Sequence, residues 1–180
     1  MSDLTKLIAP SFYGVHHDIK AGRHTHYWLK GGRGSTKSSF ISVEIILGMM
    51  QDTAANALVL RKVAVNLKDS VYEQLLWAIE ALGVEHLWKA KLSPLQLSYL
   101  PTGQRILFRG ADEPKKIKST KFRKGYCKYI WYEEADEFAG MQEIRTINQS
   151  LMRGGSSFFV FYSYNPPKSQ SNWVNRECLQ

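Results

Sequence analysis

Short apolar runs alternate along the chain with longer segments whose apolar residues recur at helical spacing. Runs of this length, bounded by Gly, Pro, Asn or Asp, are typical of buried strands. Because strands and helical segments alternate, the pattern favours a layered α/β fold with a mostly parallel sheet flanked by helices. The runs that predict strands cover residues 26–29, 57–60, 126–132 and 157–163.

Four segments carry the helical pattern, and one pair of apolar runs predicts a hairpin instead. Helices are predicted over residues 39–50, 112–119 and 140–152. A further helix is expected between Asn66, as its cap, and Gly83, as its stop, because its apolar residues share one face. The runs at 92–100 and 104–108 flank Pro101-Thr102-Gly103, which predicts an inserted antiparallel hairpin. The apolar positions of the capped helix are Leu67, Val71, Leu75, Ile79 and Leu82.

Length and composition limit the domain organisation. The chain has 180 residues and a hydrophobic fraction of 44%, enough for one well-packed domain. Residues 1–25 hold Pro10, Gly14 and Gly22 and read as an irregular N-terminal arm, so the domain is expected over residues 26–180. No run of 18 apolar residues and no charged-then-apolar leader occurs, which argues against a membrane span or secretion.

Charge and cysteine usage add two expectations. The net charge of +8 and a pI of about 9.5 favour a polyanionic partner such as nucleic acid. Cys127 and Cys178 give no disulfide framework and suit a reducing compartment. The closely spaced histidines near the N-terminus lack a cysteine or carboxylate at suitable spacing, so they predict no metal site.

A glycine-rich turn between the first predicted strand and the first predicted helix is the strongest chemical signal. Such a turn points backbone N–H groups into one concave site at a helix N-terminus, where amides and helix dipole both favour a polyphosphate. Lys37 is expected to reach the β- and γ-phosphates, and the Ser38 hydroxyl to bind Mg²⁺. The loop residues are Gly31, Gly32, Arg33, Gly34, Ser35, Thr36, Lys37 and Ser38.

One residue departs from the usual phosphate-loop spacing. Gly31 stands six residues before Lys37, as the pattern requires, but Thr36 occupies the place of the second glycine. A Cβ at that place is expected to tighten or distort the loop and to weaken nucleotide binding.

Two adjacent carboxylates follow the predicted strand at 126–132. Nucleotide hydrolases need one acid to hold Mg²⁺ and a carboxylate to orient or deprotonate the attacking water. We therefore expect Glu133 to serve the metal and Glu134 the water. The alternative is a solvated turn or helix start, since acids are also common there.

A third polar group, Asn165, follows the strand predicted at 157–163 and precedes two prolines. An Asn at the tip of a strand beside the phosphate loop is able to sense the γ-phosphate. Loss of that phosphate on hydrolysis would then move the segment attached to the Asn. The alternative is an ordinary Asn-Pro turn.

Together these stretches resemble the N-terminal ATPase domain of phage large terminase subunits, the motors that package DNA into capsids. The likeness covers about residues 26–170 and is greatest to the siphophage and prophage type with a Glu-Glu pair after the strand. It is carried by Gly31–Ser38, by Leu60-Arg-Lys-Val63 with Leu67-Lys-Asp-Ser-Val71, by Phe108–Ser119, by Trp131–Phe138 and by Tyr164-Asn-Pro166.

The resemblance implies a P-loop NTPase of the additional-strand, catalytic-glutamate type that binds ATP and Mg²⁺. Lys37 and Ser38 would bind phosphate and Mg²⁺, Glu133 would position Mg²⁺, and Glu134 would activate water. Arg33 resembles the loop arginine that family members place on the phosphates, in cis or toward a neighbouring subunit. Asn165 would belong to the motif that couples hydrolysis to movement.

The resemblance also implies partners and a setting. These are double-stranded DNA, a terminase small subunit, a capsid portal and a working ring of identical subunits in the cytoplasm of an infected bacterium. Family members carry a C-terminal nuclease domain that this chain is expected to lack. Two alternatives stay open: a helicase-like or remodelling DNA-dependent ATPase, and a non-hydrolysing P-loop module that binds DNA or a partner.

Residues 115–128 form a basic run without any acid, with Phe122 and Tyr126 interleaved. One interpretation is contact with a DNA phosphate backbone without reading its sequence. The other is a solvated basic loop near the nucleotide site. The cations are Lys115, Lys116, Lys118, Lys121, Arg123, Lys124 and Lys128.

Overall fold

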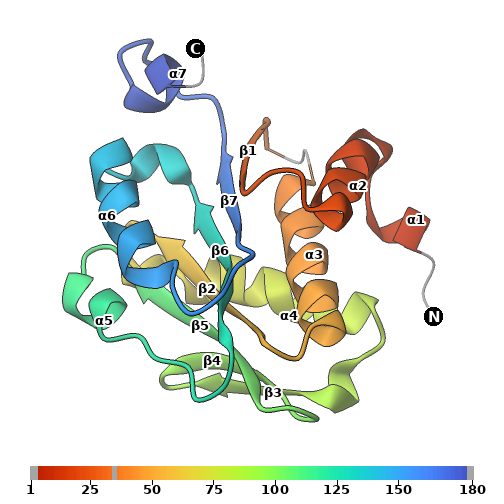
Figure 1. The fold of residues 1–180 in the computed structure, drawn as a ribbon. Coiled ribbons are helices and arrows are strands. Elements are labelled where there is room, and N and C mark those ends of the chain that lie inside the picture. The colour runs from red at the N-terminus through yellow and green to blue at the C-terminus, as the bar shows by residue number, and fades with distance from the viewer. Residues whose placement is uncertain (1–3, 34–35, 178–180) are drawn as a thin grey trace.

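A seven-stranded sheet forms the centre of the computed structural model, which describes residues 4–33 and 36–177 (Figure 1). The strand order is β1-β7-β6-β2-β5-β4-β3. The strands are β1 (His26–Lys30), β2 (Ala55–Arg61), β3 (Trp88–Leu92), β4 (Leu95–Tyr99), β5 (Gln104–Gly110), β6 (Tyr126–Glu133) and β7 (Phe159–Tyr164).

The sheet has a parallel part and an antiparallel part. Strands β1, β7, β6, β2 and β5 pair in parallel, whereas β4 is antiparallel to both β5 and β3. Each strand predicted from an apolar run is present, with ends that differ by a few residues. The predicted fold class, a mostly parallel α/β sheet with an inserted antiparallel hairpin, is confirmed.

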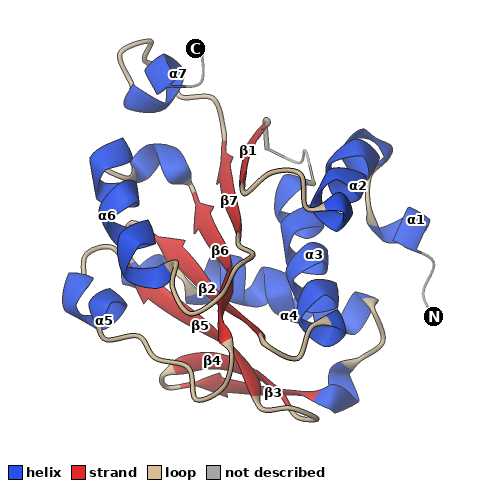
Figure 2. Ribbon diagram, in the orientation of Figure 1, coloured by secondary structure: helices blue, strands red, loops and turns tan. Residues whose placement is uncertain are grey.

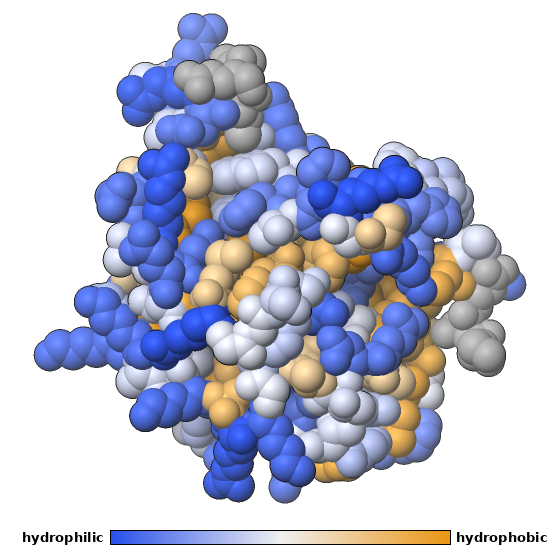
Figure 3. Space-filling model, viewed as in Figure 1, coloured by the Kyte–Doolittle hydropathy of each residue, from blue (hydrophilic) through white to orange (hydrophobic). Residues whose placement is uncertain are grey.

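Helices cover both faces of the parallel part (Figure 2). Helices α2, α3 and α4 lie on one face, and α5 and α6 on the other. In α5 the side chain of Ile117 is buried, while the lysines of the helix face solvent. Figure 3 shows hydrophilic side chains projecting over α5. The helices are α1 (Leu4–Leu7), α2 (Tyr13–Ala21), α3 (Lys37–Gln51), α4 (Glu73–Ala81), α5 (Pro114–Lys118), α6 (Met141–Leu151) and α7 (Trp173–Glu177).

Two apolar cores lie on opposite sides of the sheet, and the central strands supply both. In β2, Ala57 and Val59 face the core under α3 and α4, while Leu58 and Leu60 face the core under α6. Side chains alternate between the faces of a strand, so a strand covered on both faces is apolar throughout. This is why the parallel strands read as continuous apolar runs.

The N-terminal segment is helical, so the prediction of an irregular arm over residues 1–25 is wrong for the part that the structure describes. Pro10 begins a short 3-10 helix, and Gly22 ends α2 with a φ of 65°. Both residues therefore mark helix boundaries rather than loop. Phe12 stacks on Phe40 of α3 with ring centroids 4.8 Å apart, and Ile19 is buried.

The segment between Asn66 and Gly83 begins differently from its prediction. A π-helical stretch, Lys68–Tyr72, precedes α4. The N-cap position of this π-helical stretch is Leu67, and no side chain caps it. Asn66 is therefore not a helix cap. Its carbonyl accepts a hydrogen bond from the Ser70 hydroxyl. The predicted stop is confirmed, because α4 is followed by Gly83 with a φ of 69°.

The predicted hairpin is present but shorter at its start. Strand β4 pairs with β5 across the turn at Pro101-Thr102-Gly103, with Gln96 opposite Leu107. Leu92 belongs instead to β3, a strand that the apolar pattern did not reveal, because only Trp88 in it is buried. Among the described residues, no helix is both long and apolar enough to cross a membrane.

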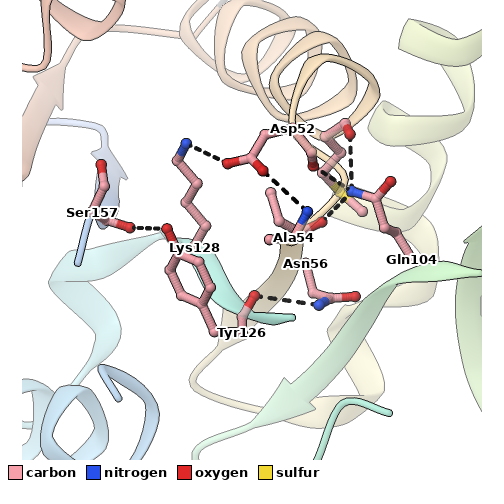
Figure 4. Close-up of polar contacts among 9 residues, drawn as sticks. Asp52, Ala54, Asn56, Gln104, Tyr126, Lys128 and Ser157 are labelled. Atoms are coloured by element: carbon pink, nitrogen blue, oxygen red, sulfur yellow. Dashed lines mark hydrogen bonds and ion pairs between the residues drawn. The ribbon is translucent and has the colours of Figure 1, made fainter. Parts of the chain in front are cut away.

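Asn56 fills a break in the pairing of β2 with β6, where the register shifts between Asn56 and Ala57. Its amide N–H₂ donates to the carbonyl of Tyr126 (Figure 4) and to that of Lys124, and its Oδ1 accepts from the backbone N–H of Arg105. The side chain is almost fully buried. It thus joins the start of β6 to β2 and β5.

Replacement of Asn56 by Ala is expected to lower the free energy of unfolding by about 2–3 kcal/mol, because buried backbone groups lose their partners. The matched control is Asn66→Ala, at an exposed position, for which a change below about 0.5 kcal/mol is expected. Urea denaturation of both variants measures the difference. Equal losses would contradict the assigned role of Asn56.

Candidate functional site

Three loops that are far apart in the sequence meet at the carboxyl ends of β1, β7 and β6. Because these strands are neighbours and parallel, their carboxyl ends share one edge of the sheet. Lys37 contacts Asn165, and Ser38 contacts Glu133, over separations of 128 and 95 residues. The predicted phosphate loop, acidic pair and Asn therefore lie together.

The glycine-rich loop is attached to the end of β7. The backbone N–H of Gly31 donates to the carbonyl of Tyr164 at 3.2 Å. Lys37 folds back over the loop, and its Nζ donates to the carbonyl of Gly31 at 3.1 Å. Gly32 is exposed, whereas the predicted loop residues Gly34 and Ser35 lie outside the described residues.

Helix α3 begins directly after the loop with Thr36 at its N-cap. The Thr36 carbonyl accepts from the N–H of Phe40 at 3.0 Å, and no side-chain hydrogen bond caps the helix. The first N–H groups of a helix have no partner inside it. The N-terminus of this 15-residue helix therefore presents amide donors and a positive dipole end to the loop.

Backbone strain is concentrated at this edge of the sheet. Among the described residues, the non-glycine residues with positive φ are Thr36, at 62°, and Glu134, at 52°. This left-handed conformation costs a residue with a Cβ about 1–2 kcal/mol. Such strain gathers at functional sites. At Thr36 it also explains why a glycine is usual at that position.

The amide of Asn165 lies against the Lys37 ammonium group. Its Oδ1 accepts from Lys37 Nζ at 2.8 Å. A γ-phosphate bound at Lys37 would therefore lie within reach of Asn165. The arrangement brings together the two residues that the sequence assigned to phosphate contact and phosphate sensing.

The Ser38 hydroxyl and the Glu133 carboxyl place oxygen atoms near one another at this edge. The Ser38 hydroxyl lies 3.5 Å from Oε1 of Glu133, while Oε2 of Glu133 is buried and has no hydrogen-bond partner. A buried carboxylate oxygen without a partner is costly unless a cation or donor completes it. Hydroxyl and carboxylate oxygens are ligands that Mg²⁺ accepts, so these residues fit that ion.

Burial controls the protonation of the acidic pair and of the lysine. It raises the pKa of Glu133 to about 7, against the lowering effect of the Arg61 charge. Burial, and then the charge of Asp136, also raise the pKa of Glu134. Burial lowers the pKa of Lys37, opposed by the charges of Glu134 and Glu133. The site thus holds opposite charges in a poorly solvated space.

Arg61 is a residue of this site to which no role was assigned from the sequence, although it stands in one of the stretches that carry the resemblance. It ends β2, whose Leu60 lies opposite Tyr132 of β6, so Arg61 stands beside Glu133. Its Nη2 lies 3.4 Å from the carboxylate of Glu137, and its charge lowers the pKa of Glu133 and Glu134. The available signal was a cation that follows an apolar run at the end of a parallel strand.

Arg33, in contrast, is not brought to the acidic pair. Its side chain is exposed, and no hydrogen bond or ion pair with another described residue is present. Its predicted contact with the phosphates stays a prediction.

The raised pKa of Glu133 predicts a pH-dependent effect of Glu133→Gln. Below pH 4.5 the carboxyl is neutral in both the folded and the unfolded chain. As pH rises through about 7, the folded chain must bury a charge, so stability is lost. Without nucleotide or Mg²⁺, the variant is therefore expected to exceed the unmodified chain in stability by about 2–3 kcal/mol at pH 8, with little difference at pH 4.

Chemical denaturation of both proteins at the two pH values measures this. The matched control is Glu137→Gln, an exposed acid of the same turn. A stability difference for Glu133→Gln that does not change with pH would contradict the assigned burial.

Known proteins share the sequence pattern and the fold of this chain. The family model for the phage terminase large subunit matches residues 23–180. The large terminase subunit of Bacillus phage SPP1 is 45% identical over 177 residues, which are 96% of this chain and 42% of that protein. The large terminase subunit of phage PBSX from Bacillus subtilis is 35% identical over 87% of this chain and 34% of its own length. The chain thus spans less than half the length of these relatives.

A solved structure shows the same fold at low sequence identity. The N-terminal domain of the DNA packaging ATPase from bacteriophage phi29 superposes with a TM-score of 0.70 at 10% identity, over 94% of this chain and 88% of that domain. The sequence match over nearly the whole chain is what assigns the family. This chain belongs to the phage terminase large subunit family.

Proposed function

We propose that residues 26–180 are the Mg²⁺-dependent ATPase domain of a motor that moves double-stranded DNA into a procapsid. The observation that carries this proposal is the meeting of Lys37 with Asn165 and of Ser38 with Glu133 at one sheet edge, beside the strained Glu134. The family match favours a packaging motor over a helicase-like or remodelling ATPase.

Each residue of the site has a separate task in this proposal. The amides of the loop and of the first turn of α3 bind the triphosphate, with the Lys37 ammonium on the β- and γ-phosphates. Ser38 and Glu133 hold Mg²⁺, which neutralises charge on the phosphates when bound. Glu134 accepts a proton from the water that attacks the γ-phosphate.

The conformation of Glu134 suits this role. Its positive φ turns the chain out of β6 immediately after Glu133, so Glu134 lies in the turn and not on the strand. The raised pKa of Glu134 makes its carboxylate a better proton acceptor than an exposed glutamate. Strain at this residue therefore serves its orientation.

Asn165 and Arg33 complete the proposed cycle. Asn165 reports the γ-phosphate through its contact with Lys37, and the loss of that phosphate releases the segment that follows β7. Arg33, exposed in the loop, is free to reach the phosphates in cis or those of a neighbouring subunit. An arginine on the transferring phosphoryl group is worth about 10³–10⁵ in rate.

The proposed partners follow from the family. They are double-stranded DNA, a terminase small subunit and a capsid portal, with the domain working in a ring of identical subunits. The setting is the cytoplasm of the infected bacterial host.

Two substitutions separate binding of ATP from its hydrolysis. Lys37→Ala is expected to abolish nucleotide binding, since the phosphates lose their cation. Glu134→Gln is expected to retain binding while phosphate release falls by about 10²–10⁴. A fluorescent ATP analogue measures binding, and phosphate release with Mg²⁺, with and without duplex DNA, measures hydrolysis.

Glu137→Gln is the control for charge in the acidic turn, because Glu137 is exposed and faces Arg61. Nucleotide binding without turnover in the unmodified chain would favour the non-hydrolysing P-loop module. Binding that survives Lys37→Ala would contradict the phosphate loop itself.

The strain at Thr36 predicts a gain on replacement by glycine. Thr36→Gly is expected to stabilise the chain by about 0.5–1 kcal/mol, because relief of the left-handed conformation exceeds the entropy cost of glycine. Nucleotide affinity is expected to rise with it. Thr36→Ala keeps the Cβ, so neither gain is expected. Thermal unfolding and nucleotide titration compare the two variants, and equal behaviour would rule out strain as the cause.

A further inference from the structure

A dense group of cations lies away from the nucleotide site, in residues 115–124, here named the basic segment. It holds six cations and no acid. Lys116 pairs with Glu113 at 2.9 Å. Within the described part of the chain, no ion pair neutralises the other five, and all five are exposed. They are Lys115, Lys118, Lys121, Arg123 and Lys124.

The backbone of the basic segment is held by contacts with residues of β2 and β5 and with the residue before β2. Buried Asn56 donates to the carbonyl of Lys124, and Arg105 donates to the carbonyl of Lys121. Gly125, with a φ of 71°, lies so close to the backbone of Ala54 that a Cβ would clash with it. Figure 4 shows the anchoring side of this region, around Asn56 and the start of β6. The segment therefore presents its cations from a preformed backbone, which reduces the entropy cost of binding.

The two aromatic side chains of this region are already engaged inside the protein. Arg105 lies over the ring of Phe122 at 5.8 Å. The Tyr126 hydroxyl donates to the carbonyl of Ser157, and its ring packs against Phe158. Proteins that bind single strands stack bases on free aromatic rings. The basic segment offers cations without such rings, so it fits the phosphate backbone of a duplex.

Arg153 extends the surface from a second element. It lies in the turn after α6 and lines, with Lys121, a cavity of about 280 Å³ between that turn and the end of the basic segment. Cations from two separate segments thus face the same space.

The end of the basic segment, from Lys121 to Lys124, leads to the opposite edge of the sheet from the nucleotide site, whereas Lys115 to Lys118 lie in α5, which follows the carboxyl end of β5. The basic segment leads into the amino end of β6, whereas Glu133 ends that strand, roughly 23 Å away at about 3.3 Å per residue. In Figure 1 the chain between α5 and β6 runs along the lower end of the sheet, while β1, β6 and β7 point toward the upper end. The residues that lead into β6 are therefore remote from Glu133, and a solvated basic loop near the nucleotide site stays a prediction for the lysines of α5.

We propose that the basic segment and Arg153 form a surface that binds the phosphate backbone of double-stranded DNA. The choice of DNA as the polyanion rests on the proposed function. Contacts of this kind carry no sequence information, which suits a motor that must pass every sequence. Because the surface shares no residue with the nucleotide site, substitutions in it are expected to leave nucleotide binding unchanged.

The test replaces three exposed lysines, Lys118→Gln, Lys121→Gln and Lys124→Gln, in one variant. A matched control carries Lys20→Gln, Lys89→Gln and Lys91→Gln, which are also exposed and change the net charge equally. Fluorescence anisotropy with a random-sequence duplex, without nucleotide, is measured over a range of salt concentrations. The first variant is expected to lose about tenfold or more in affinity. The slope of its plot of log K against log salt is expected to become smaller in magnitude by about 2–3.

Several outcomes would overturn the proposal. They are absence of duplex binding by the unmodified chain at about 50 mM salt, equal losses in both triple variants, and unchanged duplex binding in the first. Stronger competition by poly-glutamate than by duplex at equal charge would assign the surface to an acidic protein. Tighter binding of single-stranded than of duplex DNA would also contradict it.

A separate readout keeps the two proposals distinguishable. Binding of the fluorescent ATP analogue is expected to be the same in both triple variants and in the unmodified chain, which also verifies folding. Loss of duplex binding with retained nucleotide binding supports the surface. Failure of nucleotide binding in the unmodified chain would instead count against the ATPase proposal and leave the DNA result to be judged by its own controls.

Discussion

The parallel register of β6 between β7 and β2 is the constraint on which the candidate site depends. It sets Glu133 opposite Ser163 and Tyr132 opposite Leu60, so the acidic pair, Asn165 and Arg61 come level at one edge. Large side chains fix this register on both faces. The indole N–H of Trp131 donates to Ser163 Oγ at 2.8 Å on one face, and the Tyr132 hydroxyl donates to Asn148 on the other. A slip of one residue would exchange these faces.

That fixed edge explains how the chain tolerates strain at Thr36 and Glu134. Each strained residue directly follows or precedes a well-packed element: Glu134 follows buried β6, and Thr36 precedes α3, most of whose residues are buried. The surrounding packing over-determines the backbone at both positions. The result is a site whose unusual conformations are supported by the cores on either side of the sheet.

Much of this arrangement was predictable from sequence because the signals were local. Continuous apolar runs gave the parallel strands, and Gly31 to Ser38, Glu133, Glu134 and Asn165 stood at the ends of three of them. What could not be read were features that depend on distant partners. The N-terminal helices are held by contacts such as Phe12 on Phe40, and β3 has one buried residue, so neither carried a pattern of its own. Arg61 joins the site only through the pairing of β2 with β6.

The distribution of charge along β6 gives the domain a direction. The basic segment precedes its amino end, and four acids, Glu133, Glu134, Asp136 and Glu137, follow at its carboxyl end. In the proposed function these acids disfavour a long nucleic acid at the carboxyl end, where Lys37 and the N-terminus of α3 receive the triphosphate. The strand between the basic segment and these acids is buried throughout most of its length and is a poor candidate for deformation.

In the proposed function, movement driven by hydrolysis therefore leaves the site through the loops. The structure offers one such route: the indole N–H of Trp173, in α7, donates at 2.7 Å to the carbonyl of Phe138, just past the acidic turn. The ring of Trp173 also meets Trp28 of β1 edge to face. The segment that follows Asn165 is thus held both to the turn that carries Glu134 and to the strand that leads into the phosphate loop. A change in the turn that carries Glu134, or in β1, alters the contacts that hold α7, whereas β6 keeps its position in the sheet.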